Sequence, residues 1–88
     1  MREVDLHLGR GHDGIQALDR QMARFRGELN SAIRAGEKAL TFIHGVGSGK
    51  LREAIHDALA SDYPSCSWHD APFSRYGYNG ATVVTIRQ

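Results

Sequence analysis

The 88-residue chain lacks most features that mark membrane, secreted or disulfide-bonded proteins. Its single cysteine, Cys66, cannot form an internal disulfide, and no apolar leader opens the chain, which predicts a reducing, cytoplasmic location. No apolar run approaches the ~20 residues of a membrane-spanning helix, so we expect no membrane partner. A net charge of +1 argues neither for nor against a polyanionic partner. The length predicts one globular domain over residues 1–88.

The chain does have the residue patterns of a small α/β domain. Alternation predicts strands at 3–8 and 81–87, a short apolar run predicts one at 39–43, and we take residues 66–70 as a third strand between them. Apolar residues three or four apart predict two helices, one from Asp13 to a glycine stop at Gly36 and one over about 49–61. Residues 71–80 are rich in turn formers and predict an exposed loop. Since a helix joins the first two strands, we expect them to be parallel.

Three glycines, Gly45, Gly47 and Gly49, lie between the second strand and the second helix. A flexible turn leading into a helix amino end suits an anion, most often a phosphate. The turn is not a nucleotide-binding P-loop, because Gly45 and Gly49 enclose too few residues and Leu51 replaces the hydroxyl that binds magnesium. His44 ends the strand beside this turn and titrates near neutral pH. The combination predicts phosphodiester chemistry rather than ATP binding.

A second histidine, His7, lies two residues after Asp5 in the first strand. Side chains two apart in a strand point the same way, so Asp5 is placed to orient the His7 ring, although a solvated polar strand end has the same pattern. The carboxyl ends of parallel strands meet at one sheet edge, where we expect His7 and His44 to form a joint site. Lys50 and Arg52 lie in the first turn of the second predicted helix, where positive charge opposes the helix dipole. This placement favours contact with a phosphate.

Three motifs in this order resemble those of the Smr (small MutS-related) domain family, found alone and at the end of MutS2-type proteins. They are Val4 to His7, Ile43 to Arg52, and Gly77 to Thr82 followed by Val84. The chain departs from the family where Leu8 precedes Gly9 and where Tyr78 replaces a glycine. The resemblance covers nearly the whole chain. It implies a two-layer α/β sandwich, βαβαββ with a four-stranded mixed sheet, similar to the C-terminal domain of translation initiation factor 3.

The resemblance also implies an endonuclease that cleaves RNA or nicks DNA. His7, oriented by Asp5, is the expected general base, and His44 is the expected general acid or hydrogen-bond donor. The expected phosphate and nucleic-acid contacts are Gly45, Gly47, Gly49, Lys50, Arg52, Arg75, Gly77 and Gly80. On RNA the 2′-hydroxyl can be the nucleophile and no cofactor is required, whereas DNA calls for an activated water and a magnesium ion near Asp5. The remaining histidines, His12, His56 and His69, are expected to be surface or structural residues.

Two alternatives stay open. The chain could be a nucleic-acid-binding module without chemistry, whose binding to RNA or to branched or double-stranded DNA falls with salt. It could also be an interaction domain of a larger multidomain protein. Cleavage of a substrate would separate the nuclease from both.

Overall fold

The computed structural model describes residues 2–7, 15–45, 47–77 and 79–87. The elements follow in the order β1 (Arg2–Asp5), α1 (Ile15–Arg34), β2 (Ala39–Ile43), α2 (Lys50–Asp62), β3 (Cys66–Asp70), α3 (Phe73–Tyr76) and β4 (Ala81–Ile86). The predicted βαβαββ order is confirmed. The short helix α3 is an addition, because it lies where the turn-rich sequence predicts only a loop.

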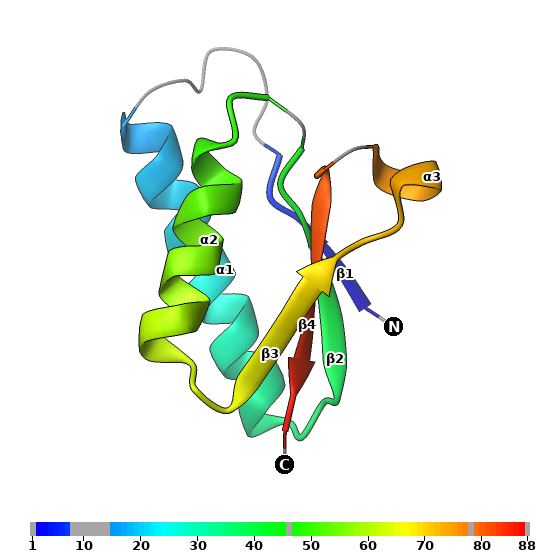
Figure 1. Cartoon of the computed structure of the whole chain (residues 1–88). Coiled ribbons are helices and arrows are strands. Elements are labelled where there is room, and N and C mark those ends of the chain that lie inside the picture. Colours follow the sequence, from blue (N-terminus) through cyan, green and yellow to red (C-terminus); the bar gives the residue numbers. More distant parts are fainter. Residues whose placement is uncertain (1, 8–14, 46, 78, 88) are drawn as a thin grey trace.

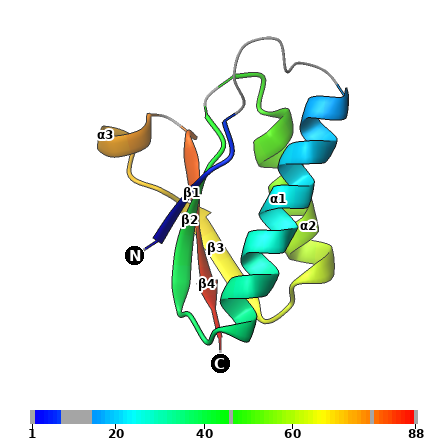
Figure 2. The same ribbon diagram turned by 180° about the vertical axis from the view of Figure 1, so that it is seen from behind.

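The strands form one mixed sheet in the order β1-β2-β4-β3 (Figures 1 and 2). β1 pairs parallel with β2, as predicted, and β4 pairs antiparallel with β2 and with β3. The helices α1 and α2 lie together against one face of the sheet, whereas α3 lies on the opposite side (Figures 1 and 2). We call these the helix face and the open face. The ends of β1, β2 and β3 and the start of β4 share one edge of the sheet.

The main core fills the space between the two long helices and the sheet. Its largest fully buried side chains are Phe25, Phe42, Leu6, Leu29, Leu40, Ile55, Leu59 and Val84. Phe25 of α1 and Phe42 of β2 meet edge to face, with ring centroids 4.7 Å apart, which is a favourable aromatic geometry. A smaller cluster on the open face contains Ala71, Ala81 and Val83. Alternate residues of β2 and β4 therefore enter different environments.

Glycine ends α1 where the sequence predicts a stop. Gly36 has φ 73°, and the amide of Glu37 donates to the carbonyl oxygen of Ala32 at 3.0 Å. This is the arrangement of a glycine-terminated helix. The predicted start at Asp13 lies outside the described residues. In the described part of the chain, no helix has the length and the apolar composition that crossing a membrane requires.

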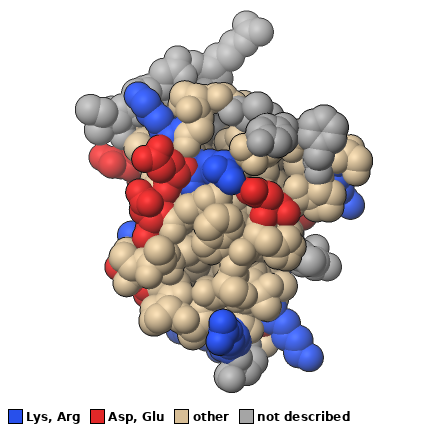
Figure 3. Space-filling view, in the orientation of Figure 1, with Lys and Arg blue, Asp and Glu red and all other residues tan. Residues whose placement is uncertain are grey.

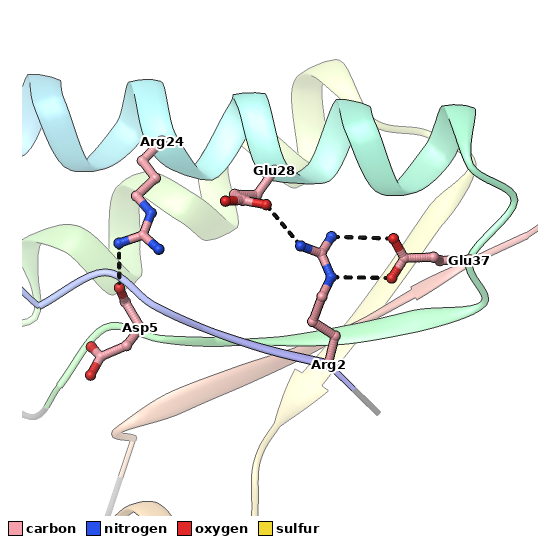
Figure 4. Close-up of polar contacts among 5 residues, drawn as sticks. All are labelled: Arg2, Asp5, Arg24, Glu28 and Glu37. Atoms are coloured by element: carbon pink, nitrogen blue, oxygen red, sulfur yellow. Dashed lines mark hydrogen bonds and ion pairs between the residues drawn. The ribbon is translucent and has the colours of Figure 1, made fainter.

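Two arginines fasten the short strand β1 to the helix layer (Figure 4). Arg2 lies between two carboxylates, with Nη1 2.8 Å from Glu28 and Nε 3.2 Å from Glu37. Arg24 of α1 donates from Nη1 to the carbonyl oxygen of Asp5 at 2.8 Å. Exposed ion pairs contribute little stability individually. Together, however, these contacts define where the carboxyl end of β1 lies.

Candidate active site

His44 follows β2 directly and points into the helix face, in alternation with Leu40 and Phe42. Its Nε2 lies 2.8 Å from Thr82 Oγ1 of β4, and its Nδ1 lies 3.2 Å from the carbonyl oxygen of Gly45. Burial lowers the pKa of His44, and the nearby Arg52 cation lowers it further. His44 is therefore a neutral imidazole near neutral pH, with a fixed partner at each nitrogen.

The glycine turn adopts the backbone conformations that its residues permit. Gly45 and Gly49 have φ 80° and 84°, in the left-handed region that favours glycine, and Gly47 is exposed between them. Gly49 is the N-cap of α2 and supplies no side-chain cap, but the amide of Lys50 donates to Ser48 Oγ at 3.4 Å. The amide of Gly45, however, donates to the carbonyl oxygen of Gly80 at 2.9 Å. The predicted phosphate cradle is therefore smaller than expected, because the Gly45 amide already has a partner.

Lys50 and Arg52 begin α2 but differ in their surroundings. Lys50 is exposed. Arg52 directs Nη2 at both carboxylate oxygens of Asp70 in β3, at 2.9 and 3.1 Å, and its Nε is buried without a partner among the described residues. Arg52 thus braces α2 against β3, which leaves Lys50 as the cation presented to solvent in this turn. Basic and acidic side chains lie next to one another on this side of the molecule (Figure 3).

A second imidazole, from α2, reaches the same threonine. Nε2 of His56 lies 2.9 Å from Thr82 Oγ1, and the His44 and His56 ring centroids are 6.3 Å apart. The His56 ring also stacks on the ring of Trp68 in β3, with centroids 3.7 Å apart. Burial, followed by the charge of Arg52, lowers the pKa of His56 to about 4. The sequence interpretation of His56 as a residue outside the site misses this contact.

The first strand brings Asp5 and His7 to the same sheet edge, but with a different arrangement from the predicted one. β1 ends at Asp5, whose carboxylate accepts the backbone N–H of His7 at 2.8 Å. Among the described residues no hydrogen bond joins this carboxylate to the His7 ring, and none joins His7 to His44. Asp5 therefore orients the main chain of His7, not its imidazole, and its side chain points away from α1 (Figure 4).

The model of the Smr domain family matches residues 4–87. This chain belongs to the Smr domain family. The Smr domain of Thermus thermophilus MutS2, a crystal structure, superposes with a TM-score of 0.80 at 35% sequence identity, and the alignment covers 100% of both chains. The predicted α/β fold with a four-stranded mixed sheet is thereby confirmed.

Curated relatives of this Smr domain carry the name endonuclease MutS2. Identity is 34% over 72 residues in Aquifex aeolicus, 33% over 85 in Lactobacillus helveticus and 39% over 84 in Thermomicrobium roseum. These alignments cover 82%, 97% and 96% of the present chain, but only 9%, 10% and 10% of the relatives. The chain thus spans about a tenth of the length of these relatives.

The closing motif of this Smr domain, which begins at Gly77, is hydrogen-bonded to the main chain at His44. The carbonyl oxygen of Gly80 accepts the amides of His44 at 3.1 Å and Gly45 at 2.9 Å. A Cβ atom on Gly80 would lie 1.9 Å from the carbonyl oxygen of Tyr76, so only glycine fits. Gly77, with φ 80°, accepts the Gly80 amide at 3.2 Å. The two glycines shape the turn that holds His44, and their contact with nucleic acid stays a prediction.

Arg75 lies apart from His44 in the Smr domain. It belongs to α3, on the open face, where Nη2 is 3.2 Å from Glu3 Oε2 and the guanidinium lies 5.4 Å from the centre of the Tyr76 ring. The Tyr76 hydroxyl also donates to Glu3. The structure therefore does not bring Arg75 to the helix face with the two imidazoles.

Proposed function

We propose that this Smr domain is an endonuclease that cleaves RNA or nicks DNA with His44 as its central group. The observation that carries the proposal is the position of His44. A fixed, neutral imidazole follows β2 directly, and the glycine turn joins it to the amino end of α2. A helix amino end attracts phosphate, and an imidazole beside it can move a proton to or from the reacting oxygens. The likeness to proteins named endonuclease MutS2 supports this reading of the site.

In this proposal the histidines that follow β2 and β1 are the general acid and the general base. His44 donates from Nδ1 to the leaving oxygen, which takes the place of the Gly45 carbonyl as the partner of this nitrogen. His7 is exposed at the neighbouring strand end and accepts the proton of the nucleophile, while Asp5 fixes its main chain. The amino end of α2 and Lys50 hold the phosphate. On RNA the nucleophile is the 2′-hydroxyl. DNA would need an activated water, which a magnesium ion near Asp5 would supply, but among the described residues no cluster of three or more acidic, histidine or cysteine side chains fits a metal ion.

A cleavage assay tests the proposal. The purified domain is incubated with end-labelled RNA and with supercoiled plasmid, in magnesium and in EDTA, beside His44→Ala, His7→Ala and His69→Gln. His69 is the matched control, because it is an exposed histidine of β3 outside the proposed site. We expect cleavage that His44→Ala reduces ~10²–10⁴-fold and His69→Gln leaves intact. Intact substrates throughout, or wild-type cleavage by His44→Ala, would contradict the proposal.

A nucleic-acid-binding module without chemistry, within a larger protein, is the second candidate, and Trp68 favours it. This indole is 39% exposed and already stacks on His56, so a nucleobase could continue the stack. In this case a gel shift would weaken steeply with salt and with Trp68→Ala, while every substrate stays intact. The cleavage assay above separates the two candidates.

A further inference from the structure

A single buried hydroxyl lies between two imidazole nitrogens on the helix face. Thr82 Oγ1 is 2.8 Å from His44 Nε2 and 2.9 Å from His56 Nε2, and Thr82 is fully buried. A hydroxyl has one proton to donate and can accept in return. At most one ring can therefore accept from Thr82, and a ring that does not accept donates to it.

The carbonyl of Gly45 decides the direction. Because a carbonyl oxygen only accepts, the 3.2 Å contact places a proton on Nδ1 of His44. Nε2 of neutral His44 then carries a lone pair and accepts from the Thr82 hydroxyl. Thr82 in turn accepts from Nε2 of His56, which leaves the lone pair of His56 on Nδ1. The hydrogen bonds thus run in one direction, from His56 through Thr82 to His44 and Gly45.

We propose that Thr82 and His56 form a proton relay that resupplies His44 from solvent during phosphodiester cleavage. The relay rests on the proposed nuclease function and assigns two further residues to its site. It gives His56 a chemical role, in place of the surface role that the sequence predicts.

The proton balance of the step is as follows for RNA. The 2′-oxygen forms its bond to phosphorus and loses its proton to His7, while the bond from phosphorus to the 5′-oxygen breaks. The leaving oxygen keeps the electron pair and takes the Nδ1 proton of His44. The Thr82 proton moves to Nε2 of His44, the Nε2 proton of His56 moves to Thr82, and a solvent proton adds to Nδ1 of His56. Both rings end neutral with exchanged tautomers, and His7 releases the proton of the 2′-hydroxyl to solvent. Before the next cleavage a solvent proton adds to Nδ1 of His44, and the protons of the relay move back through Thr82 and His56 to solvent.

The electrostatics of the site favour a relay over a preformed imidazolium. Burial is the main cause that lowers the pKa of both rings, and the Arg52 cation adds to it. The hydrogen bond to the Gly45 carbonyl raises the pKa of His44, and Asp70 of β3 raises the pKa of both rings, as Asp57 of α2 does for His56. None of these outweighs burial. A charged imidazole is therefore scarce at neutral pH, and a chain of neutral groups can still deliver a proton.

Three substitutions separate a relay from a merely structural hydrogen bond. Thr82→Val removes the hydroxyl at nearly constant shape, and Thr82→Ser keeps it. His56→Gln keeps an N–H donor for Thr82, but an amide nitrogen cannot take up a solvent proton. A structural role predicts that His56→Gln works as the wild type does, whereas a relay predicts that it fails. His69→Gln is again the control.

The first measurement is independent of cleavage. In ¹⁵N-detected NMR spectra of the imidazoles near neutral pH, we expect His44 as the Nδ1–H tautomer and His56 as the Nε2–H tautomer. The opposite tautomers, or two charged rings, would overturn the relay even if the domain cuts RNA.

The second measurement uses two RNA substrates in single-turnover cleavage, made once the wild-type cleavage position is mapped. One is ordinary RNA, and the other carries a bridging 5′-sulfur there, whose thiolate leaves without a proton. On ordinary RNA we expect Thr82→Val and His56→Gln to lose ~10²-fold and Thr82→Ser to keep most activity. On the sulfur substrate both impaired variants should approach the wild-type rate.

The outcomes distinguish the relay from the function on which it rests. If His44→Ala is inactive while His56→Gln cuts ordinary RNA normally, the relay is wrong and the nuclease proposal stands. The same holds if the sulfur substrate does not restore the variants. If the wild type cuts neither substrate, the nuclease proposal fails, and the relay fails with it.

Discussion

The helix face and the open face of the sheet both carry polar side chains, but these side chains differ in burial and in their partners. On the helix face, His44, Thr82 and His56 are at least partly buried and hydrogen-bonded to one another. On the open face, Glu3 and Arg75 form an ion pair whose side chains are 35% and 68% exposed. Water screens the second group, whereas burial fixes the first and holds its imidazoles neutral. The two polar clusters thus differ in burial, and this difference is the reason for which we propose the helix face as the reactive one.

The largest effect should come from removing His44. His44→Ala is expected to slow single-turnover RNA cleavage ~10²–10⁴-fold, because it deletes the proton donor of the helix face. Arg75→Ala, on the open face, should change the rate far less. Equal losses in the two variants would contradict the proposal that only the helix face takes part in cleavage. Circular dichroism of both proteins checks that each is folded.

Gly80→Ala should damage both faces at once. The new Cβ would meet the Tyr76 carbonyl, on the side of α3, at 1.9 Å, and the carbonyl of Gly80 itself holds the amides of His44 and Gly45. We expect a loss of about 1–3 kcal/mol or more in the free energy of unfolding, measured with urea. Gly27→Ala is the control, because nothing lies within 4 Å of its Cβ position in α1, and it should stabilise the domain by about 1 kcal/mol. A neutral Gly80→Ala would contradict the packing described for the closing motif.

The helix face should also make stability depend on pH. The pKa of His56 is lowered from 6.5 to about 4, so between these values the unfolded chain binds a proton that the folded chain does not. The free energy of unfolding should therefore fall as the pH drops through this window, and His44 adds to the fall in the same direction. Urea titrations should show a shallower fall in His56→Gln. An unchanged slope would mean that His56 is not buried as described.

The smallest effect should come from the open face. Tyr76→Phe removes the hydroxyl that donates to Glu3, a bond that also raises the pKa of Tyr76. Because the contact is exposed, we expect only a slight decrease in the urea midpoint and no change in RNA cleavage. A large loss of cleavage would show that α3 takes part in the reaction.

Most of the fold follows from local sequence patterns. A short apolar run predicts β2, β3 is also predicted at its observed bounds, and Gly36 predicts the end of α1. These features are predictable because strand period and glycine conformation depend on neighbouring residues. α3 is too short to show a helical period, so its sequence looks like a loop.

The site was less predictable because it depends on contacts between distant elements. His56 meets Thr82 only when α2 packs on β4, and no local pattern records that. A usable clue existed in β4, where alternation puts the Thr82 hydroxyl on the buried side with Val84 and Ile86. The expected pairing of the Asp5 carboxylate with the His7 ring is not what the structure shows, because the carboxylate accepts the backbone N–H of His7 instead.

The most direct test of the account is to locate bound RNA on the two faces. A short single-stranded RNA with every 2′-hydroxyl methylated cannot react, and it can be titrated into ¹⁵N-labelled domain. We predict NMR shift changes at the amides of Leu51 and Arg52 and at the His44 ring, while Glu3 and Arg75 stay unchanged. Shift changes confined to Glu3, Arg75 and their neighbours would place the nucleic acid on the open face and contradict the account.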